Sequence, residues 1–134
     1  MRYTDPETGE DQSQHYVMKE LRCKETGIEF NVVTTHLKAK KGFEQMRANQ
    51  AAQLVEKLKQ WNLSATIITG DFNDTPDSLA IQNMLDGTGV QSAAGEQEPE
   101  FTTHKYREST GMQTRTIDYV FYKQDKIDND AAYI

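Results

Sequence analysis

The sequence predicts an α/β fold in one small domain, and three stretches carry that prediction. Residues 28–34 and 66–70 are short β-branched runs typical of buried strands. Between them, residues 43–61 repeat apolar side chains at helical spacing. Strand, helix and strand in this order indicate one β-α-β step in which the helix covers the sheet. With 134 residues the chain is long enough for one such domain and too short for two.

Composition restricts the partners that we expect. The formal net charge is −6, so an anionic substrate must be held by a local basic patch rather than by a global field. The single cysteine, Cys23, excludes an internal disulfide and gives no metal framework. A reducing compartment is compatible with this, and we expect the cytoplasm, with mitochondria as the alternative for a full-length protein. No apolar stretch approaches membrane-spanning length, so no membrane partner is expected.

The N-terminal third predicts a loop followed by a hairpin. Residues 1–14 are polar and carry turn signals, and we expect a loop or disordered end there. Residues 16–23 alternate imperfectly, and a glycine-containing turn joins them to the strand at 28–34, which predicts a hairpin. That strand runs into Thr35-His36-Leu37, so His36 lies at a strand end. A lone histidine is more often structural than catalytic, and both interpretations stay open.

Basic residues follow His36 within a short stretch. Lys38, Lys40, Lys41 and Arg47 lie within ten positions of an otherwise acidic chain. The cluster is a candidate anion site, with a solvated loop as the alternative. The helix that follows has its expected core stripe at Phe43, Met46, Ala51, Leu54, Val55, Leu58 and Trp61.

The strand at 66–70 ends in Gly70, and Asp71 and Asn73 follow it. An extended backbone would point these two side chains to the same side and leave Phe72 to anchor the turn in the core. A carboxylate beside an amide oxygen suits Mg²⁺, and a carboxylate can also orient an attacking water. The alternative is a solvated Asx turn after a strand.

The C-terminal part predicts a short helix, loops and one strong strand. Asp77 or Ser78 would cap a helix through Leu85 that Asp86-Gly87 ends, and residues 88–100 and 107–114 are loop-like. Residues 116–122 alternate as a strand and place Asp118 in its middle. A carboxylate there is costly unless a cation, a histidine or several donors satisfy it, as a metal site or a hydrogen-bond hub would. Residues 123–134 are polar and show no closing element.

Three motifs occur in a fixed order along the chain: Thr35-His36-Leu37, Gly70-Asp71-Phe72-Asn73 with Pro76, and Thr116-Ile117-Asp118-Tyr119-Val120. Together they resemble the exonuclease–endonuclease–phosphatase family over about residues 17–127. The resemblance implies part of a four-layered α/β sandwich, two packed sheets flanked by helices, in which residues 15–134 form the C-terminal portion of the catalytic domain. It also implies a Mg²⁺-dependent hydrolase of phosphate esters. In the most similar branch of the family, the substrate would be the 2′-phosphate of NADP(H), or poly(A) RNA for a 3′–5′ exoribonuclease (deadenylase).

The resemblance also implies roles for single residues. Asp71 would position or activate the attacking water and is the candidate Mg²⁺ ligand, while Asn73 and His36 would support and contact the phosphate. Asp118 would orient a catalytic histidine. The substrate phosphates would be contacted by Lys38, Lys40 and Arg107, where Lys40 replaces an arginine and so keeps the charge without the bidentate fork.

Two features of the family have no counterpart in these residues. A metal-binding glutamate is missing, and no histidine follows Tyr122, because the three histidines are His15, His36 and His104. We therefore expect a fragment of a longer protein or a truncated gene product. The alternative function is a catalytically incomplete fragment or pseudoenzyme that binds a nucleotide or a protein partner. A half-sandwich leaves one sheet face uncovered, which predicts marginal stability or self-association through that face.

Overall fold

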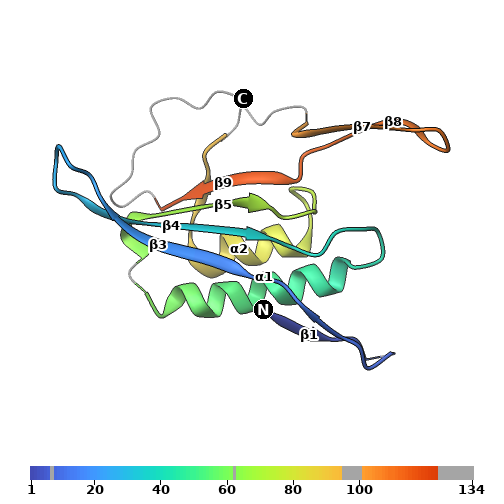
Figure 1. Cartoon of the computed structure of the whole chain (residues 1–134), viewed down its shortest axis with the longest axis horizontal. Coiled ribbons are helices and arrows are strands. Elements are labelled where there is room, and N and C mark those ends of the chain that lie inside the picture. Colours follow the sequence, from blue (N-terminus) through green and yellow to red (C-terminus); the bar gives the residue numbers. More distant parts are fainter. Residues whose placement is uncertain (7, 62, 95–100, 124–134) are drawn as a thin grey trace.

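The fold consists of a five-stranded sheet, two helices and two small hairpins, as Figure 1 shows for a computed structural model. The structure describes residues 1–6, 8–61, 63–94 and 101–123. The helical elements are α1 (Glu44–Lys59), α2 (Leu79–Thr88) and the 3₁₀ turn η1 (Leu63–Ala65). The strands are β1 (Arg2–Thr4), β2 (Asp11–Ser13), β3 (Tyr16–Arg22), β4 (Glu29–His36), β5 (Thr66–Asp71), β6 (Gln91–Ser92), β7 (Thr103–Arg107), β8 (Gly111–Arg115) and β9 (Asp118–Tyr122).

The central sheet has the order β3-β4-β5-β9-β6. Strands β4 and β5 are parallel and are joined through α1, which confirms the predicted β-α-β step. Strand β9 runs antiparallel to β5, so it begins where β4 and β5 end. Residues that follow β4 and β5 therefore meet the first residue of β9 at one edge of the sheet.

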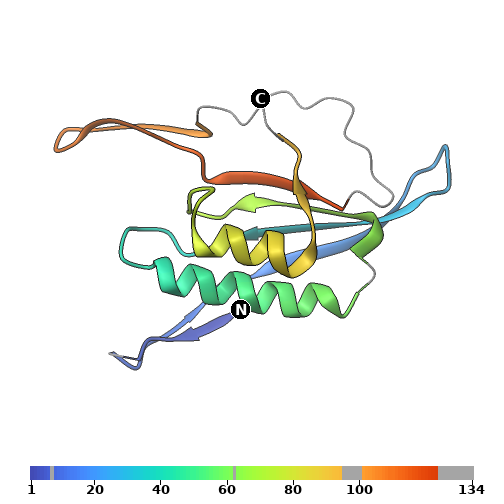
Figure 2. The same cartoon turned by 180° about the vertical axis from the view of Figure 1, so that it is seen from behind.

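Both helices pack on the same face of the sheet, as Figure 2 shows from behind. The buried cluster on this face combines strand residues such as Val33 and Ile68 with Leu54 of α1 and Met84 of α2. Phe72 is fully buried and lies edge-on to Tyr119 and Phe121, with ring centroids 5.7 and 5.5 Å apart. Burying each such side chain contributes roughly 1.5–3 kcal/mol. The predicted anchoring of the Asp71–Asn73 turn by Phe72 is confirmed.

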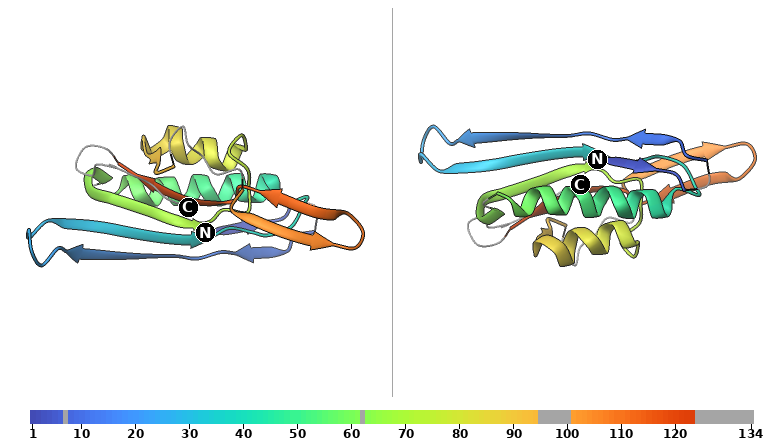
Figure 3. Two further views of the ribbon diagram at one scale, coloured as in Figure 1. Left: turned by 90° about the horizontal axis from the view of Figure 1, so that it is seen from above. Right: turned by 90° about the horizontal axis from the view of Figure 1, so that it is seen from below.

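The opposite face of the sheet is open. Val17, Leu21 and Val120 point to it by strand alternation, and they are 64%, 41% and 46% exposed. The views along the sheet in Figure 3 show both helices on the other side, and no element of the described residues covers this face. The prediction of an uncovered sheet face is therefore confirmed for the described part of the chain.

Two stretches expected to be loops form hairpins instead. Residues 2–4 and 11–13 pair as β1 and β2, and the side chain of Gln53 on α1 holds them by accepting from the N–H of Arg2, at 2.9 Å, and donating to its carbonyl. Residues 103–107 and 111–115 pair as β7 and β8, so only 108–110 of the loop expected at 107–114 form a turn. In both cases cross-strand pairing, which local composition does not reveal, organises a polar sequence.

The second helix is longer than its sequence predicts. Ser78 is its N-cap and accepts from the N–H of Ile81 at 3.3 Å, so one of the two predicted caps is confirmed. The expected end at Asp86-Gly87 is wrong, because the helix continues to Thr88 and Gly89 closes it at a φ of +66°. Gly87 lies inside α2, where it packs closely against Val55.

Candidate active site

A histidine and two carboxylates form a row across three neighbouring strands. The register places His36 of β4 opposite Asp71 of β5, and Asp71 opposite Asp118 of β9. All three lie at the same edge and, by alternation, on the open face of the sheet. The Nε2 atom of His36 is 3.7 Å from Oδ2 of Asp71. Three of the four predicted catalytic residues are therefore side by side, although they lie far apart in the sequence.

Backbone hydrogen bonds hold Asp71 in place. Its Oδ1 atom accepts from the N–H of Asn73 at 2.8 Å, and its carbonyl accepts from the N–H of Leu37 at 2.9 Å. The N–H of Phe72 donates to the carbonyl of Ile117 at 2.8 Å. The first of these bonds is the Asx turn that the sequence offered as an alternative. The turn orients the carboxylate and leaves Oδ2 on the side of His36.

Asn73, the fourth predicted catalytic residue, follows the row in a left-handed conformation. Its φ is +51°, which asparagine tolerates better than most residues. Its Nδ2 atom donates to the carbonyl of Leu37 at 2.9 Å, so the side chain bridges the ends of β4 and β5. Asn73 is half-buried and fixed in position.

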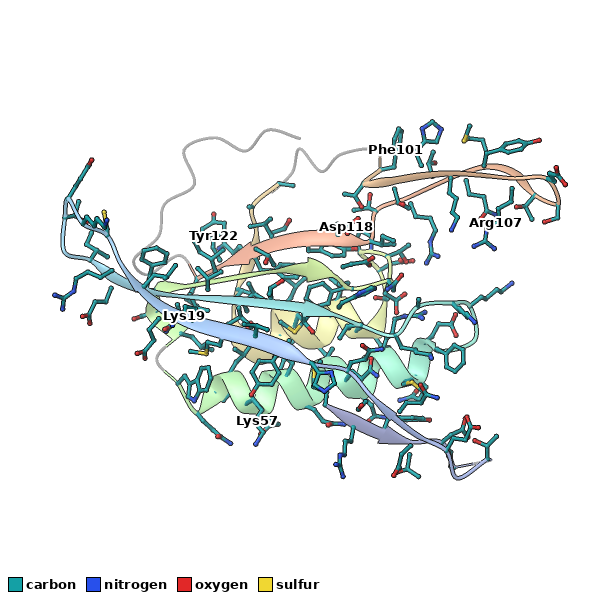
Figure 4. The ribbon with its side chains drawn as sticks, in the orientation of Figure 1. Lys19, Lys57, Phe101, Arg107, Asp118 and Tyr122 are labelled. Carbon is teal, nitrogen blue, oxygen red and sulfur yellow. The ribbon has the colours of Figure 1, made fainter. Side chains whose placement is uncertain are left out.

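Asp118 differs from its prediction. It is the first residue of β9 and is exposed, so the expected burial cost in mid-strand does not arise. The hydroxyl of Thr102 accepts from the N–H of Ile117 at 2.9 Å and from that of Asp118 at 3.1 Å, which satisfies the backbone just where the strand begins. Figure 4 shows Asp118 at this end of β9.

The basic residues separate into two places. Lys38 lies two residues after His36 in the sequence. Its Nζ donates to Oε1 of Gln12 at 3.1 Å and lies 5.0 Å from the ring centroid of Phe43. Lys40 is exposed two residues later, at a φ of +82°. Arg107 ends β7, and Figure 4 places it beyond Asp118 on the hairpin that projects past this edge.

Arg47 lies outside the exposed basic patch to which its sequence position had assigned it. It is only 2% exposed, and its Nε donates to Oδ2 of Asp74 at 2.8 Å. Its Nη1 donates to the carbonyls of Lys40 and Lys38 at 2.9 and 3.1 Å. Arg47 is spaced from Ala51, Leu54 and Leu58 as one helical stripe, a signal that could have placed it inside. Its acidic partner carried no comparable signal.

Two carboxyl groups near the site have lowered pKa values. The pKa of Glu44 is lowered below its usual range by hydrogen bonds from backbone N–H groups, first that of Glu44 itself and then that of Gly42. The hydroxyl of Thr75, and then the residue's own N–H, lower the pKa of Asp77. Both groups are therefore anions near neutral pH, and neither is a candidate general acid.

The donor chemistry of the row suits a hard cation. Asp71 and Asp118 are like charges directly opposite each other, which is unfavourable unless a cation lies near them. Mg²⁺ is commonly held by one or two carboxylates together with waters and phosphate oxygens. The described residues contain no group of three or more His, Cys, Asp and Glu side chains suited to a metal ion. Within the row, Asp71 is the residue that would hold Mg²⁺, together with waters and phosphate oxygens.

Comparison with known proteins gives consistent likenesses. A family model, described as the Endonuclease/Exonuclease/phosphatase family, matches residues 11–130. Nocturnin from Xenopus laevis is 35% identical over 90% of this chain and 33% of its own length. The human nocturnin catalytic domain with bound sulfate anion superposes with a TM-score of 0.69 and 26% identity, covering 87% of this chain and 44% of that one. A mutant beta toxin from Staphylococcus aureus with bound magnesium ions shares the fold alone, with a TM-score of 0.59 and 16% identity over 86% of this chain and 44% of that one. The chain thus spans about a third of the length of the curated relatives that it matches.

Proposed function

Because the chain belongs to the endonuclease/exonuclease/phosphatase family, as its three motifs predicted, we propose that it forms part of a Mg²⁺-dependent hydrolase of phosphate esters that resembles nocturnin. One observation carries the proposal. Three strands bring His36, Asp71 and Asp118 into one row, and a basic loop starts two residues after His36. Such a row offers an acceptor for a water proton beside groups that attract a phosphate.

The residues of the chain divide the reaction between them. Asp71, oriented by the N–H of Asn73, accepts a hydrogen bond from the attacking water and prepares it for in-line attack. The side chains of His36 and Asn73 stabilise the negative charge that develops on the phosphate oxygens. Mg²⁺, held by Asp71, would supply charge neutralisation at the phosphate when bound. Asp118 would orient a histidine from outside the row.

The substrate class follows from the relatives and from the basic residues. We propose the 2′-phosphate of NADP(H), with poly(A) RNA shortened by a 3′–5′ deadenylase as the competing substrate. Lys38 and Lys40 lie in the loop that follows β4 and would bind the phosphate. Arg107, on its projecting hairpin, would contact a more distant phosphate. The sulfate anion in the human nocturnin structure is an oxyanion of the same shape, which supports an anionic substrate.

Partners and location are further parts of the proposal. None of the helices in the described part of the chain is long and apolar enough to cross a membrane. We place the protein in the cytoplasm, with mitochondria as the alternative for a full-length form. The open sheet face would associate with a second copy of the chain.

The alternative is a non-catalytic module that keeps the scaffold and binds a nucleotide or a protein. It is favoured because the described residues contain no group of three or more His, Cys, Asp and Glu side chains that could hold a metal ion. A nucleotide-binding module predicts phosphate binding, as the catalytic function does, and only the catalytic function predicts turnover.

The test is release of phosphate from NADP⁺, with Mg²⁺ and with EDTA, beside shortening of a poly(A) oligonucleotide. It should be run on the 134-residue chain and on the full-length protein. Turnover by the full-length protein should be abolished by EDTA and should fall about 10²–10⁴-fold in Asp71→Asn, because the water would lose its acceptor. The matched control is Asp86→Asn, which changes an exposed carboxylate on α2, a helix of the other sheet face.

The outcomes separate the alternatives. Phosphate release without poly(A) shortening identifies the dinucleotide as substrate, and the reverse identifies RNA. Turnover that is unchanged in Asp71→Asn would overturn the assignment of the site. Phosphate binding without turnover by the folded full-length protein would establish the non-catalytic module.

A further inference from the structure

A buried arginine on α1 connects the basic loop with the turn that carries Asp71. Arg47 and its partner Asp74 are 2% and 5% exposed, and their side chains meet at 2.8 Å. The same guanidinium donates through Nη1 to two carbonyls of the loop, those of Lys38 and Lys40. One side chain therefore touches both segments that frame the proposed phosphate site.

The loop takes much of its backbone order from α1. Lys40 has a φ of +82°, a conformation that a non-glycine residue adopts only when its surroundings impose it. One turn further along α1, Gln50 is fully buried and accepts the N–H of Lys38 through Oε1 at 3.1 Å. Arg47 and Gln50 thus bind the carbonyl and the N–H of the same residue, Lys38. This is a two-point attachment of the loop to the helix.

The other end of the connection reaches the strand that carries Asp118. The carbonyl of Asp74 accepts from the hydroxyl of Tyr119 at 2.9 Å, and the N–H of Thr75 donates to Oδ1 of Asp74 at 3.2 Å. Tyr119 is buried and directly follows Asp118 in β9. A displacement of Asp74 would therefore shift Asp118 through Tyr119, and it would shift Asp71 through the turn that links Asp71 to Asp74.

We propose that Arg47 is a positioning residue for phosphate binding: it sets where Lys38 and Lys40 lie relative to Asp71. This inference rests on the proposed function, because it concerns the same phosphate site. A lysine cannot replace it, since a single ammonium lacks the planar fork that spans Asp74 on one side and two carbonyls on the other. The role is exerted through the loop and the turn, without contact with the substrate.

The test compares two double variants, each of which replaces an ion pair that involves a residue of α1. In Arg47→Met/Asp74→Leu the buried ion pair is replaced by apolar groups of similar size, a change that buried pairs often tolerate without loss of stability. In the control, Glu56→Leu/Lys59→Met, an exposed ion pair of the same helix, 2.9 Å apart, is replaced in the same way. Arg47→Lys keeps the charge opposite Asp74 and is the third variant.

The readouts are binding of inorganic phosphate, followed by NMR at the amides of Lys38 and Lys40, and KM and kcat of the full-length protein. We expect the Kd for phosphate to rise about tenfold or more in Arg47→Met/Asp74→Leu and in Arg47→Lys, and to stay within about twofold in the control. For substrate, KM should rise more than kcat falls, because the displaced loop residues Lys38 and Lys40 are the ones proposed to bind phosphate. Loss of hydrogen-exchange protection at the loop amides should accompany the change.

Failure of this inference is distinguishable from failure of the proposed function. An unchanged phosphate Kd in folded Arg47→Lys would reduce Arg47 to a structural residue and leave the phosphate site intact. Absence of phosphate binding by the unsubstituted protein would overturn the phosphate site itself, and the positioning role with it. Equal loss of affinity in the control variant would show a non-specific effect of charge and would also overturn the positioning role.

Discussion

Replacing Gly70 with alanine tests how closely β4 and β5 must approach at the candidate site. Gly70 precedes Asp71 and pairs with Thr35. A Cβ atom at this position would lie 2.1 Å from the carbonyl oxygen of Thr35, and the backbone φ is +156°. The neighbour is backbone, so relief requires the two strands to move apart. The same movement would separate His36 from Asp71.

The expected cost has two parts. A backbone conformation that essentially only glycine adopts costs an L-residue about 1–3 kcal/mol. Forcing a methyl group against a well-packed neighbour costs about 1–3 kcal/mol more. We therefore expect Gly70→Ala to lower the free energy of unfolding by about 2–6 kcal/mol, a large fraction of the roughly 5–15 kcal/mol typical of a domain.

The assay is urea unfolding followed by circular dichroism, with Gly27→Ala as the matched control. Gly27 has a φ of +72°, and among the described residues no heavy atom other than those of its chain neighbours lies within 4 Å of the place that an alanine methyl group would take, so its substitution measures backbone strain alone. That control should cost about 1–2 kcal/mol. If Gly70→Ala is no more destabilising than Gly27→Ala, the close approach of the two strands does not limit stability and the reasoning is refuted.

Three further predictions concern other parts of the molecule. In Gly87→Ala the new Cβ would lie 2.4 Å from Cγ1 of Val55. Overpacking of about 1–3 kcal/mol less a gain of about 1 kcal/mol in helix propensity predicts a net loss of up to about 2 kcal/mol in urea unfolding. The loss should shrink in a Val55→Ala background, and equal losses in the two backgrounds would contradict the contact. The Thr26 side chain, by hydrogen bonding, lowers the pKa of Cys23, so Thr26→Val should slow alkylation by iodoacetamide at neutral pH, and an unchanged rate would count against that bond. Val120 is 46% exposed on the open face, and Leu79 is 65% exposed on α2. If the chain self-associates through the open face, sedimentation should show weaker self-association for Val120→Lys than for the control Leu79→Lys. Equal behaviour of the two variants would exclude the open face as the self-association surface.

The predicted elements that proved right depend on local signals. The strands β3, β4, β5 and β9 and the helix α1 all lie within a few residues of their predicted ranges, because side-chain periodicity and glycine breaks act over short distances. The two ends of the predicted helical stripe are exceptions. Phe43 is the N-cap of α1 and is half-buried, and Trp61 is 40% exposed beyond the end of the helix at Lys59. The predicted tail at 124–134 lies outside the described residues.

The residue types of the candidate site were also predictable. His36 and Asp71 end apolar strands, and Asp118 stands in a recognisable motif. The family and the fold class predicted from these motifs were confirmed by the comparison with known proteins. Their catalytic and phosphate-binding roles remain predictions. By itself, the sequence determined which side chains are available for chemistry and near which strand ends they occur.

Only the tertiary structure decided how these residues meet. Register across β4, β5 and β9 aligned His36, Asp71 and Asp118 into one row, and this register depends on hydrogen bonds between residues up to about fifty positions apart. Likewise, Arg47 was expected in the basic patch, but in the folded chain it forms a buried ion pair with Asp74, 27 positions away in the sequence. Burial and pairing belong to the assembled chain, since the partner that makes a buried charge tolerable can lie anywhere along it.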